Sequence, residues 1–331
     1  MMILLSRTPF RISFLGGGTD FPFFFEKHGG YCLATSIDKY SYIYLRRLAG
    51  NFGFRNEFIY SKFERTSDDL DEIKHPIIRE ALKLEGVEGI RIDYDADIPA
   101  RTGLATSSSF AVGLVNTLGA LKGEVRSKRE LADKAIHIER VMCQEAGGIQ
   151  DQISSAFGGL NLIEFSKNGY DVQPVRMPDE RKSQFESNLM LFYTKIQRTS
   201  SEIQKRIKSP SEITQNLLIL KHLALEGFEC LINDRIELDD FGLILNEAWK
   251  SKKCLSDAVT TSFIDKCYLE GLAAGALGGK ILGAGGGGFL LFYVPQSRQE
   301  SVRDALKDLI EIKFGFEDKG SQILLNFRDD A

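Results

Sequence analysis

The chain has 331 residues, of which 43% are hydrophobic and 27% charged, and its formal net charge is −4 at pH 7. This composition is typical of a globular protein with a substantial core, and the length allows two domains of ordinary size. The slightly acidic balance argues against a nucleic acid or an anionic membrane as the main partner.

The cysteines and the N-terminus indicate the compartment. The five cysteines are scattered and none forms a CxxC pair, which supports neither a disulfide framework nor a zinc site. The apolar run at the N-terminus is too short for a signal peptide, and no later run is long enough to span a bilayer. We therefore expect a cytoplasmic protein that binds neither nucleic acid nor membrane.

The first elements alternate strands with one helix. Residues 3–15 mix β-forming residues with Pro9 and predict an edge strand. The strand leads into three glycines followed by Thr19 and Asp20. Glycines let a backbone approach a ligand closely, although such a triplet also makes ordinary turns in which an Asp bonds its own backbone. Residues 31–48 and 89–98 predict further strands, and residues 76–84 predict a helix between them.

Residues 99–109 read Pro-Ala-Arg-Thr-Gly-Leu-Ala-Thr-Ser-Ser-Ser and precede an apolar segment that predicts a buried helix. Thr106 or Ser107 is expected to cap the first turn. A helix start of small residues suits an anion, because its free N–H groups and the helix dipole both favour negative charge. Hydroxyl groups beside it can also ligate Mg²⁺. The alternative is an ordinary capped helix without a ligand.

The rest of the chain continues the mixed pattern. Residues 127–144 predict an amphipathic helix that runs into Gly-Gly-Ile-Gln-Asp-Gln, and a strand follows near residue 160. Polar residues and two prolines at 167–186 suggest a boundary or crossover. Beyond it we expect a strand at 188–197, helices through 200–275, a glycine loop at 278–288 feeding another strand, a helix at 297–312 and a closing strand at 321–327. This order predicts an α+β fold.

Two common phosphate-binding motifs do not fit. The run from Gly283 to Gly288 satisfies GxGxxG, but it precedes a strand instead of opening a helix after one. Gly279-Lys280 is followed by Ile281, so no Walker A motif is present. The glycine loops are therefore of a phosphate-cradling type that belongs to neither class.

Three separated motifs together resemble the GHMP kinase superfamily, which includes galactokinases, homoserine kinases and mevalonate kinases. They are Thr8-Pro-Phe-Arg with the glycine run ending at Asp20, the stretch 99–108, and the glycine loop 283–288. Within the superfamily, residues 8–20 look most like the D-glycero-D-manno-heptose 7-phosphate kinases. The resemblance implies a two-lobed fold with lobes at 1–175 and 176–331 and the active site in the cleft between them. The third motif should reach across to touch the second.

The resemblance also implies roles for individual residues, with ATP and Mg²⁺ as cofactors. Asp151 resembles the general base and Arg11 the arginine beside it. Ser107 and Glu139 resemble the Mg²⁺ ligands. The phosphates of ATP would be held by the loop and helix start at Gly103, Leu104, Ala105, Thr106, Ser107 and Ser108. Ala105 stands where the superfamily usually has glycine.

Sugar binding is assigned to Asp20 with Thr19 and Gly18, because a carboxylate can accept two hydrogen bonds from a diol. Arg198 follows a predicted strand and precedes a probable helix start at 199–201, so it is the first candidate to bind a phosphate already on the sugar. Glu139 could instead be a surface helix charge, and Arg198 a solvated one.

The sequence is compatible with three functions, which are two kinds of sugar kinase and a protein without catalytic activity. The leading expectation is an ATP-dependent kinase of the anomeric C1 hydroxyl of heptose 7-phosphate, which forms the 1,7-bisphosphate. The alternatives are a galactokinase- or fucokinase-like enzyme for an unphosphorylated sugar, and a catalytically silent member that binds nucleotide or sugar. The sequence also allows a homodimer.

Overall fold

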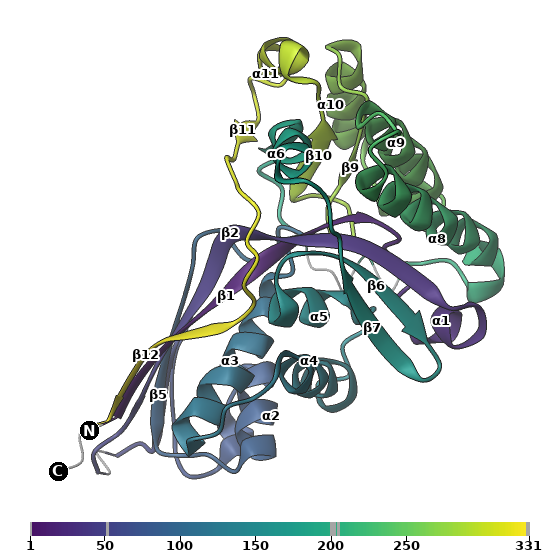
Figure 1. Ribbon diagram of the computed structural model, residues 1–331. Coiled ribbons are helices and arrows are strands. Elements are labelled where there is room, and N and C mark those ends of the chain that lie inside the picture. Colours follow the sequence, from purple (N-terminus) through teal and green to yellow (C-terminus); the bar gives the residue numbers. More distant parts are fainter. Residues whose placement is uncertain (1, 51–52, 199–202, 204–205, 329–331) are drawn as a thin grey trace.

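Two β-sheets and their covering helices build the computed structural model, which describes residues 2–50, 53–198, 203 and 206–328. The larger sheet has the strand order β12-β1-β2-β5-β3-β4, with β6 pairing with β2 and β7 with β6. The smaller sheet has the order β11-β8-β10-β9. Figure 1 shows the larger sheet below the smaller one, with the start of β1 beside the end of β12 at one end of the larger sheet.

The strands of the larger sheet are β1 (Met2–Leu15), β2 (Gly30–Arg47), β3 (Asn56–Ile59), β4 (Phe63–Thr66), β5 (Ile90–Ala96), β6 (Leu160–Ser166), β7 (Gly169–Pro174) and β12 (Gln322–Arg328). Those of the smaller sheet are β8 (Leu189–Tyr193), β9 (Gly278–Ile281), β10 (Phe289–Tyr293) and β11 (Ile310–Glu311). The predicted strands and helices occur in the predicted order, and the structure adds elements at 22–28, 56–59, 63–66, 169–174 and 179–187. The α+β assignment is confirmed.

Four helices lie on one side of the larger sheet (Figure 1): α2 (Pro76–Glu85), α3 (Thr106–Lys122), α4 (Lys128–Ile136) and α5 (Gln150–Phe157). A further group accompanies the smaller sheet or the rim between the sheets: α1 (Pro22–His28), α6 (Asp179–Ser187), α8 (Pro210–Ile232), α9 (Asp239–Lys253), α10 (Ser262–Ala273) and α11 (Gln299–Ala305). The helix α3 is buried on nearly every side, which fits its almost continuous apolar sequence.

One of the hydrophobic clusters joins the two halves of the chain. Phe14 of β1 packs edge-on against Phe185 of α6 at 5.5 Å between ring centroids, and Phe185 packs against Phe241 of α9 at 4.7 Å. All three side chains are fully buried. Aromatic pairs of this geometry add to the free energy gained from burial, so the two sheets are held together by a shared core.

The closing strand β12 returns to the larger sheet, where it pairs with residues 2–7 of β1. The prediction of an edge strand is therefore wrong for the first half of β1, which lies between β12 and β2. Pro9 is compatible with this position because the pairing with β12 ends at Arg7, before the residue that lacks an N–H. A chain division at residue 175 places β12 in the second part, although its hydrogen bonds lie in the first sheet.

Two predicted helices are shorter than expected. The segment 127–144 forms α4 only to Ile136 and then a π-helix at His137–Met142. The segment 297–312 contains a 3₁₀ turn, α11 and the short strand β11. In contrast, α2 and β12 agree with their predictions to within a residue or two.

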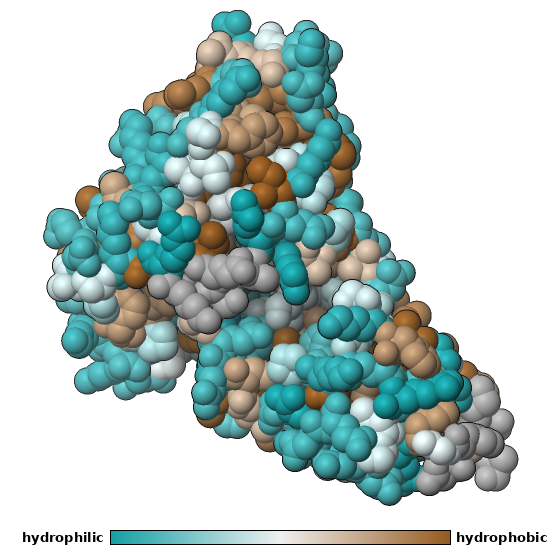
Figure 2. All heavy atoms as spheres, turned by 180° about the vertical axis from the view of Figure 1, so that it is seen from behind, coloured by the Kyte–Doolittle hydropathy of each residue, from teal (hydrophilic) through white to brown (hydrophobic). Residues whose placement is uncertain are grey.

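No helix in the described part of the chain is both long and apolar enough to cross a membrane. Figure 2 shows the opposite face from Figure 1, where hydrophilic residues cover most of the surface and apolar residues form smaller separate areas.

Candidate active site

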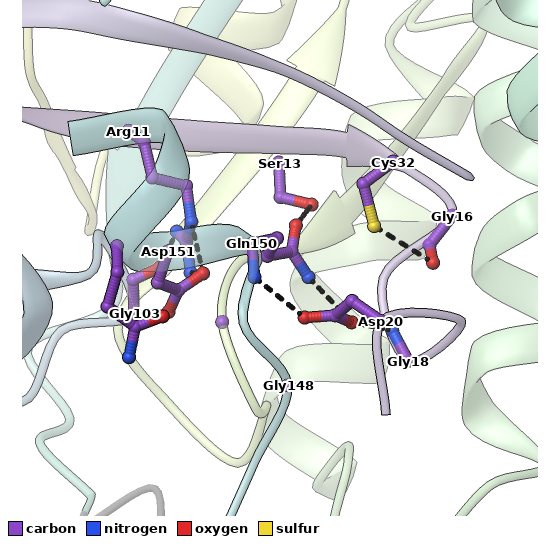
Figure 3. Close-up of polar contacts among 12 residues, drawn as sticks. Arg11, Ser13, Gly16, Gly18, Asp20, Cys32, Gly103, Gly148, Gln150 and Asp151 are labelled. Carbon is purple, nitrogen blue, oxygen red and sulfur yellow. Dashed lines mark hydrogen bonds and ion pairs between the residues drawn. The ribbon is translucent and has the colours of Figure 1, made fainter. Parts of the chain in front are cut away.

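Arg11 connects three parts of the site that are far apart in the sequence. Its Nε and Nη2 atoms lie 2.8 and 2.7 Å from Oδ1 of Asp151, and the two residues are 140 positions apart. Its Nη1 donates to the carbonyl of Gly103 at 2.9 Å. The side chain is 4% exposed and that of Asp151 is 25% exposed. Figure 3 shows Arg11 and Asp151 side by side, with the Asp151 carboxylate held from one side only.

Asp20 lies beside this pair and is almost completely buried. Its Oδ1 accepts hydrogen bonds from the backbone N–H of Gly18 and from Nε2 of Gln150, and its Oδ2 accepts one from the backbone N–H of Gln150. Burial raises the pKa of the Asp20 carboxyl, and the negative charge of Asp151 raises it further. A Cβ on Gly148 would lie 1.8 Å from Oδ2, so glycine is required there.

Thr19 has a different place in this loop from Asp20. Its hydroxyl donates to the carbonyl of Tyr31 and accepts from the Tyr31 N–H, and its side chain is fully buried. These bonds fix the loop against β2. Gly18 contributes its N–H to Asp20 and has φ +102°, a conformation that favours glycine. In the structure, Thr19 therefore fixes the loop against β2, and Gly18 donates a hydrogen bond to Asp20.

The start of α3 differs from its prediction. Neither Thr106 nor Ser107 occupies the cap position. Ala105 does, with φ +63° in the left-handed region, and no described side chain caps the helix. The first N–H groups of a helix have no partner within it, so here they stay available to an anion. The left-handed conformation is also a physical reason for glycine at this position in similar sequences, since a Cβ is strained there.

The hydroxyl of Ser107 donates instead to Oε1 of Glu139 at 2.8 Å. Glu139 lies in the π-helix and is 1% exposed, so the alternative of a surface charge is wrong. Its Oε2 accepts from Nε2 of Gln152 at 2.5 Å. A hydroxyl and a carboxylate oxygen are ligands that suit Mg²⁺, which needs few protein ligands. The described residues contain no group of three or more His, Cys, Asp or Glu that could hold a metal by themselves.

The third motif touches the second, as predicted. A Cβ on Gly283 would lie 2.6 Å from Cα of Gly103, and one on Gly288 would lie 2.1 Å from the carbonyl oxygen of Thr102. These contacts leave no room for side chains, which explains the glycines. The glycine loop of the second half therefore closes directly over the start of the phosphate loop.

Lys252 of α9 was not predicted. Its Nζ donates to the carbonyl of Gly283 at 2.6 Å, and the residue is 8% exposed. Burial, together with the positive charge of Arg11, lowers the pKa of Lys252 to about 8. No local pattern in the sequence distinguishes this lysine from its half-buried neighbour Lys253. Gln150 and Gln152 were not predicted as site residues either, although their positions on either side of Asp151 in the Gly-Ile-Gln-Asp-Gln segment are a usable signal.

Arg198 lies near the third motif, with an exposed side chain. Its backbone N–H donates to the carbonyl of Arg101 at 3.3 Å, and its Cγ lies 3.7 Å from the position of a Cβ on Gly286. The predicted helix start at 199–201 lies outside the described residues. The structure thus brings Arg198 close to both glycine loops but not into the cluster around Asp151.

Two family domains match the chain, one in each half. Residues 73–159 match the GHMP kinases N terminal domain and residues 231–311 match the GHMP kinases C terminal domain. The chain is a GHMP kinase. The second and third motifs, at 99–108 and 283–288, fall within the matched residues, and the fold is the α+β fold of that family.

This GHMP kinase is similar to several characterised proteins over nearly its whole length. It is 28% identical to a D-glycero-alpha-D-manno-heptose 7-phosphate kinase from Campylobacter jejuni, over 93% of this chain and 94% of that enzyme. It is 24% identical to a galactokinase from Pyrococcus furiosus, over 95% of each. Its fold is similar to that of a D-glycero-D-manno-heptose 1-phosphate kinase from Bacteroides thetaiotaomicron, with a TM-score of 0.78 and 24% identity over 99% of this chain and 100% of that one.

Proposed function

We propose that this GHMP kinase transfers the γ-phosphoryl group of ATP to the C1 hydroxyl of D-glycero-D-manno-heptose 7-phosphate and forms the 1,7-bisphosphate. The observation that carries the proposal is the cluster of Arg11, Asp151 and Asp20 beside two glycine loops. Similarity to the Campylobacter jejuni enzyme over 93% of this chain and 94% of that enzyme supports the choice of sugar.

Asp151 is proposed as the general base. Both contacts from Arg11 fall on Oδ1, so Oδ2 remains to accept the proton from the C1 hydroxyl. The hydroxyl oxygen then attacks the γ-phosphorus and ADP leaves. Phosphoryl transfer depends chiefly on positioning and on charge neutralisation, and a fixed carboxylate contributes to the first of these.

Ser107 and Glu139 are proposed to hold Mg²⁺. When bound, the ion would neutralise charge on the phosphates of ATP. The two residues already lie within hydrogen-bond distance, and the buried Glu139 is held from its other side by Gln152. The N–H groups from Ala105 to Ser108 are proposed to bind the phosphates of the nucleotide.

Asp20 is proposed to accept a hydrogen bond from a hydroxyl of the sugar, and Arg198 to bind its 7-phosphate. The second candidate function is phosphorylation of an unphosphorylated sugar, which the exposure of Arg198 and the similarity to galactokinases favour. For the whole protein we propose two lobes divided near residue 175, with β12 returning from the second part of the chain to the sheet of the first lobe. We also propose a cytoplasmic location. A homodimer is the proposed assembly, which light scattering tests.

One coupled assay tests the function. ADP production from ATP and Mg²⁺ is measured with heptose 7-phosphate, galactose, fucose and mannose as acceptors. We expect the heptose 7-phosphate to have the highest kcat/KM. Equal or better turnover of a free sugar would contradict the proposed substrate, and ADP production without any dependence on a sugar would contradict the sugar-kinase function.

A further inference from the structure

Two glutamines flank Asp151 at the start of α5 and reach in different directions. Successive helical residues point about 100° apart, so residues 150, 151 and 152 face three different neighbours. Gln150 meets Asp20, Asp151 meets Arg11, and Gln152 meets Glu139. Each glutamine thus contacts one of the two other buried carboxylates around Asp151.

Gln150 restrains Asp20 with two donors. Its backbone N–H bonds Oδ2 and its Nε2 bonds Oδ1, each at 3.1 Å, while its Oε1 accepts from the Ser13 hydroxyl at 2.6 Å. The orientation of the amide is unambiguous because an ionised carboxylate only accepts hydrogen bonds. Figure 3 shows Ser13, Gln150 and Asp20 as one continuous chain of contacts.

These contacts limit what Asp20 can offer a sugar. An ionised carboxylate has about four acceptor positions. Gly18 and the two donors of Gln150 use three of them, two on Oδ1 and one on Oδ2, and the backbone N–H of Asp20 itself also bonds the carboxylate. At most one position therefore remains for a ligand. Asp20 can accept no more than one hydroxyl, and not both hydroxyls of a diol as its residue type alone suggests.

Gln152 restrains Glu139 in a similar way but from the interior. Its side chain is fully buried, and Nε2 donates to Oε2 of Glu139 while Ser107 donates to Oε1. The Oε1 atom of Gln152 is buried without a hydrogen-bond partner among the described residues. An unpaired buried acceptor lowers the stability of the fold. We attribute the presence of Gln152 to its Nε2 group, which holds the carboxylate of Glu139.

We propose that Gln150 and Gln152 are positioning residues that divide the two substrates between them. Gln150 orients the carboxylate that receives the sugar hydroxyl, and Gln152 orients the carboxylate that faces Mg²⁺ and the nucleotide. The division rests on the proposed function for the roles of Asp20 and Glu139. The contacts of the two glutamines are independent of it.

Matched variants separate the two tasks. Methionine has nearly the length of glutamine and no branch, but it lacks the amide. Gln150→Met should raise KM for the sugar about tenfold and leave KM for ATP within twofold. Gln152→Met should instead raise, about tenfold, the Mg²⁺ concentration that gives half-maximal binding of a fluorescent ATP analogue. It should leave KM for the sugar within twofold. Gln184→Met, on the exposed side of α6, is the control and should change neither.

A pH profile distinguishes positioning from packing. Gln150→Glu places a second carboxylate against Asp20, and that carboxylate can donate a hydrogen bond only when it is protonated. The sugar KM of this variant should therefore fall toward the wild-type value as the pH is lowered from 8 to 6, whereas that of Gln150→Met should show no such recovery. Loss of packing alone would give both variants the same pH dependence.

These measurements test the roles of the two glutamines separately from the identity of the substrate. The sugar used in these assays is the acceptor that the coupled assay identifies. The test of the two glutamines therefore remains valid if heptose 7-phosphate is not the substrate. Equal changes of the sugar and nucleotide constants in both variants, or no change in either, would overturn the division. If no sugar is turned over, the proposed function fails, and an unchanged Mg²⁺ dependence in Gln152→Met would overturn the inference separately.

Discussion

The starts of α3 and α4 both contain serine, but a serine side chain caps only α4. Before α4, the Ser127 hydroxyl accepts from the N–H of Glu130, and Oε2 of Glu130 accepts from the N–H of Ser127 at 2.7 Å, which forms a complete capping box. Before α3, the cap position is the strained Ala105, and the hydroxyl of Ser107 turns to Glu139 instead.

This difference in capping indicates a different role for each helix start. A capping box satisfies the first N–H groups of a helix and stabilises it by roughly 1 kcal/mol. The start of α3 lacks that stabilisation and has a strained backbone, although hydroxyl residues lie in its first turn. Strain of this kind persists where the surrounding structure enforces it, often at functional sites. Changes at α3 and α5 should therefore affect catalysis, and changes at α4 should affect stability.

The largest effect is expected from Asp151→Asn at the start of α5. Asparagine has the same shape but cannot accept the proton, so kcat should fall about 10²–10⁴-fold while nucleotide affinity is kept. Single-turnover kinetics and nucleotide titration measure both. Activity close to that of the wild type would show that Asp151 is not the base and that positioning alone carries the reaction.

Arg198→Ala tests whether the second half of the chain contributes to sugar recognition. A charge-assisted pair with phosphate contributes roughly 1.5–3 kcal/mol, so KM for the sugar phosphate should rise about 10- to 100-fold with little change in KM for ATP. Arg176→Ala, at another arginine outside the site, is the control. An unchanged sugar KM would assign the phosphate to other residues.

Ser107→Ala removes a hydroxyl that caps nothing. We expect KM for Mg²⁺-ATP to rise about tenfold, the size of one hydrogen bond to a charged group, and the free energy of unfolding to fall because the buried Oε1 of Glu139 loses its donor. Steady-state kinetics at varied Mg²⁺ and urea unfolding are the measurements. A clear loss of stability without a nucleotide effect would mean that this hydroxyl supports the helix after all.

Ser127→Ala is the matched change at α4. Loss of the capping box should lower the free energy of unfolding by roughly 1 kcal/mol and leave both KM values and kcat within twofold. Steady-state kinetics and urea unfolding of the two alanine variants side by side measure the contrast, which lies in the nucleotide KM. If the two serines behaved alike, the distinction between the helix starts would have no functional meaning.

Ala105→Gly should have the smallest effect. Glycine relieves the left-handed strain at φ +63° but loses more conformational freedom on folding, so we expect a net gain in stability of roughly 0.5–1 kcal/mol. Removal of the methyl group also widens the phosphate loop, so KM for ATP should not rise. A destabilised variant would show that the Ala105 methyl group makes a contact worth more than the strain.

The sequence by itself determined the local chemistry of this protein. The glycine runs, the hydroxyl run before α3 and the Gly-Ile-Gln-Asp-Gln segment each fall within a short window, and they were sufficient to predict the family. Helix α2 and strand β12 were also predictable, because Pro76 at a helix start and a short β-forming run act through neighbouring residues.

The tertiary structure decided which of these groups meet and which are buried. Glu139 looks like any helix charge until the π-helix places it 1% exposed against Ser107, and the pairing of β12 with β1 joins residues more than 300 positions apart. Lys252 and its neighbour Lys253 differ only in what α9 packs against. Such outcomes depend on contacts between distant segments, whereas propensities and periodicity report only on interactions along the chain.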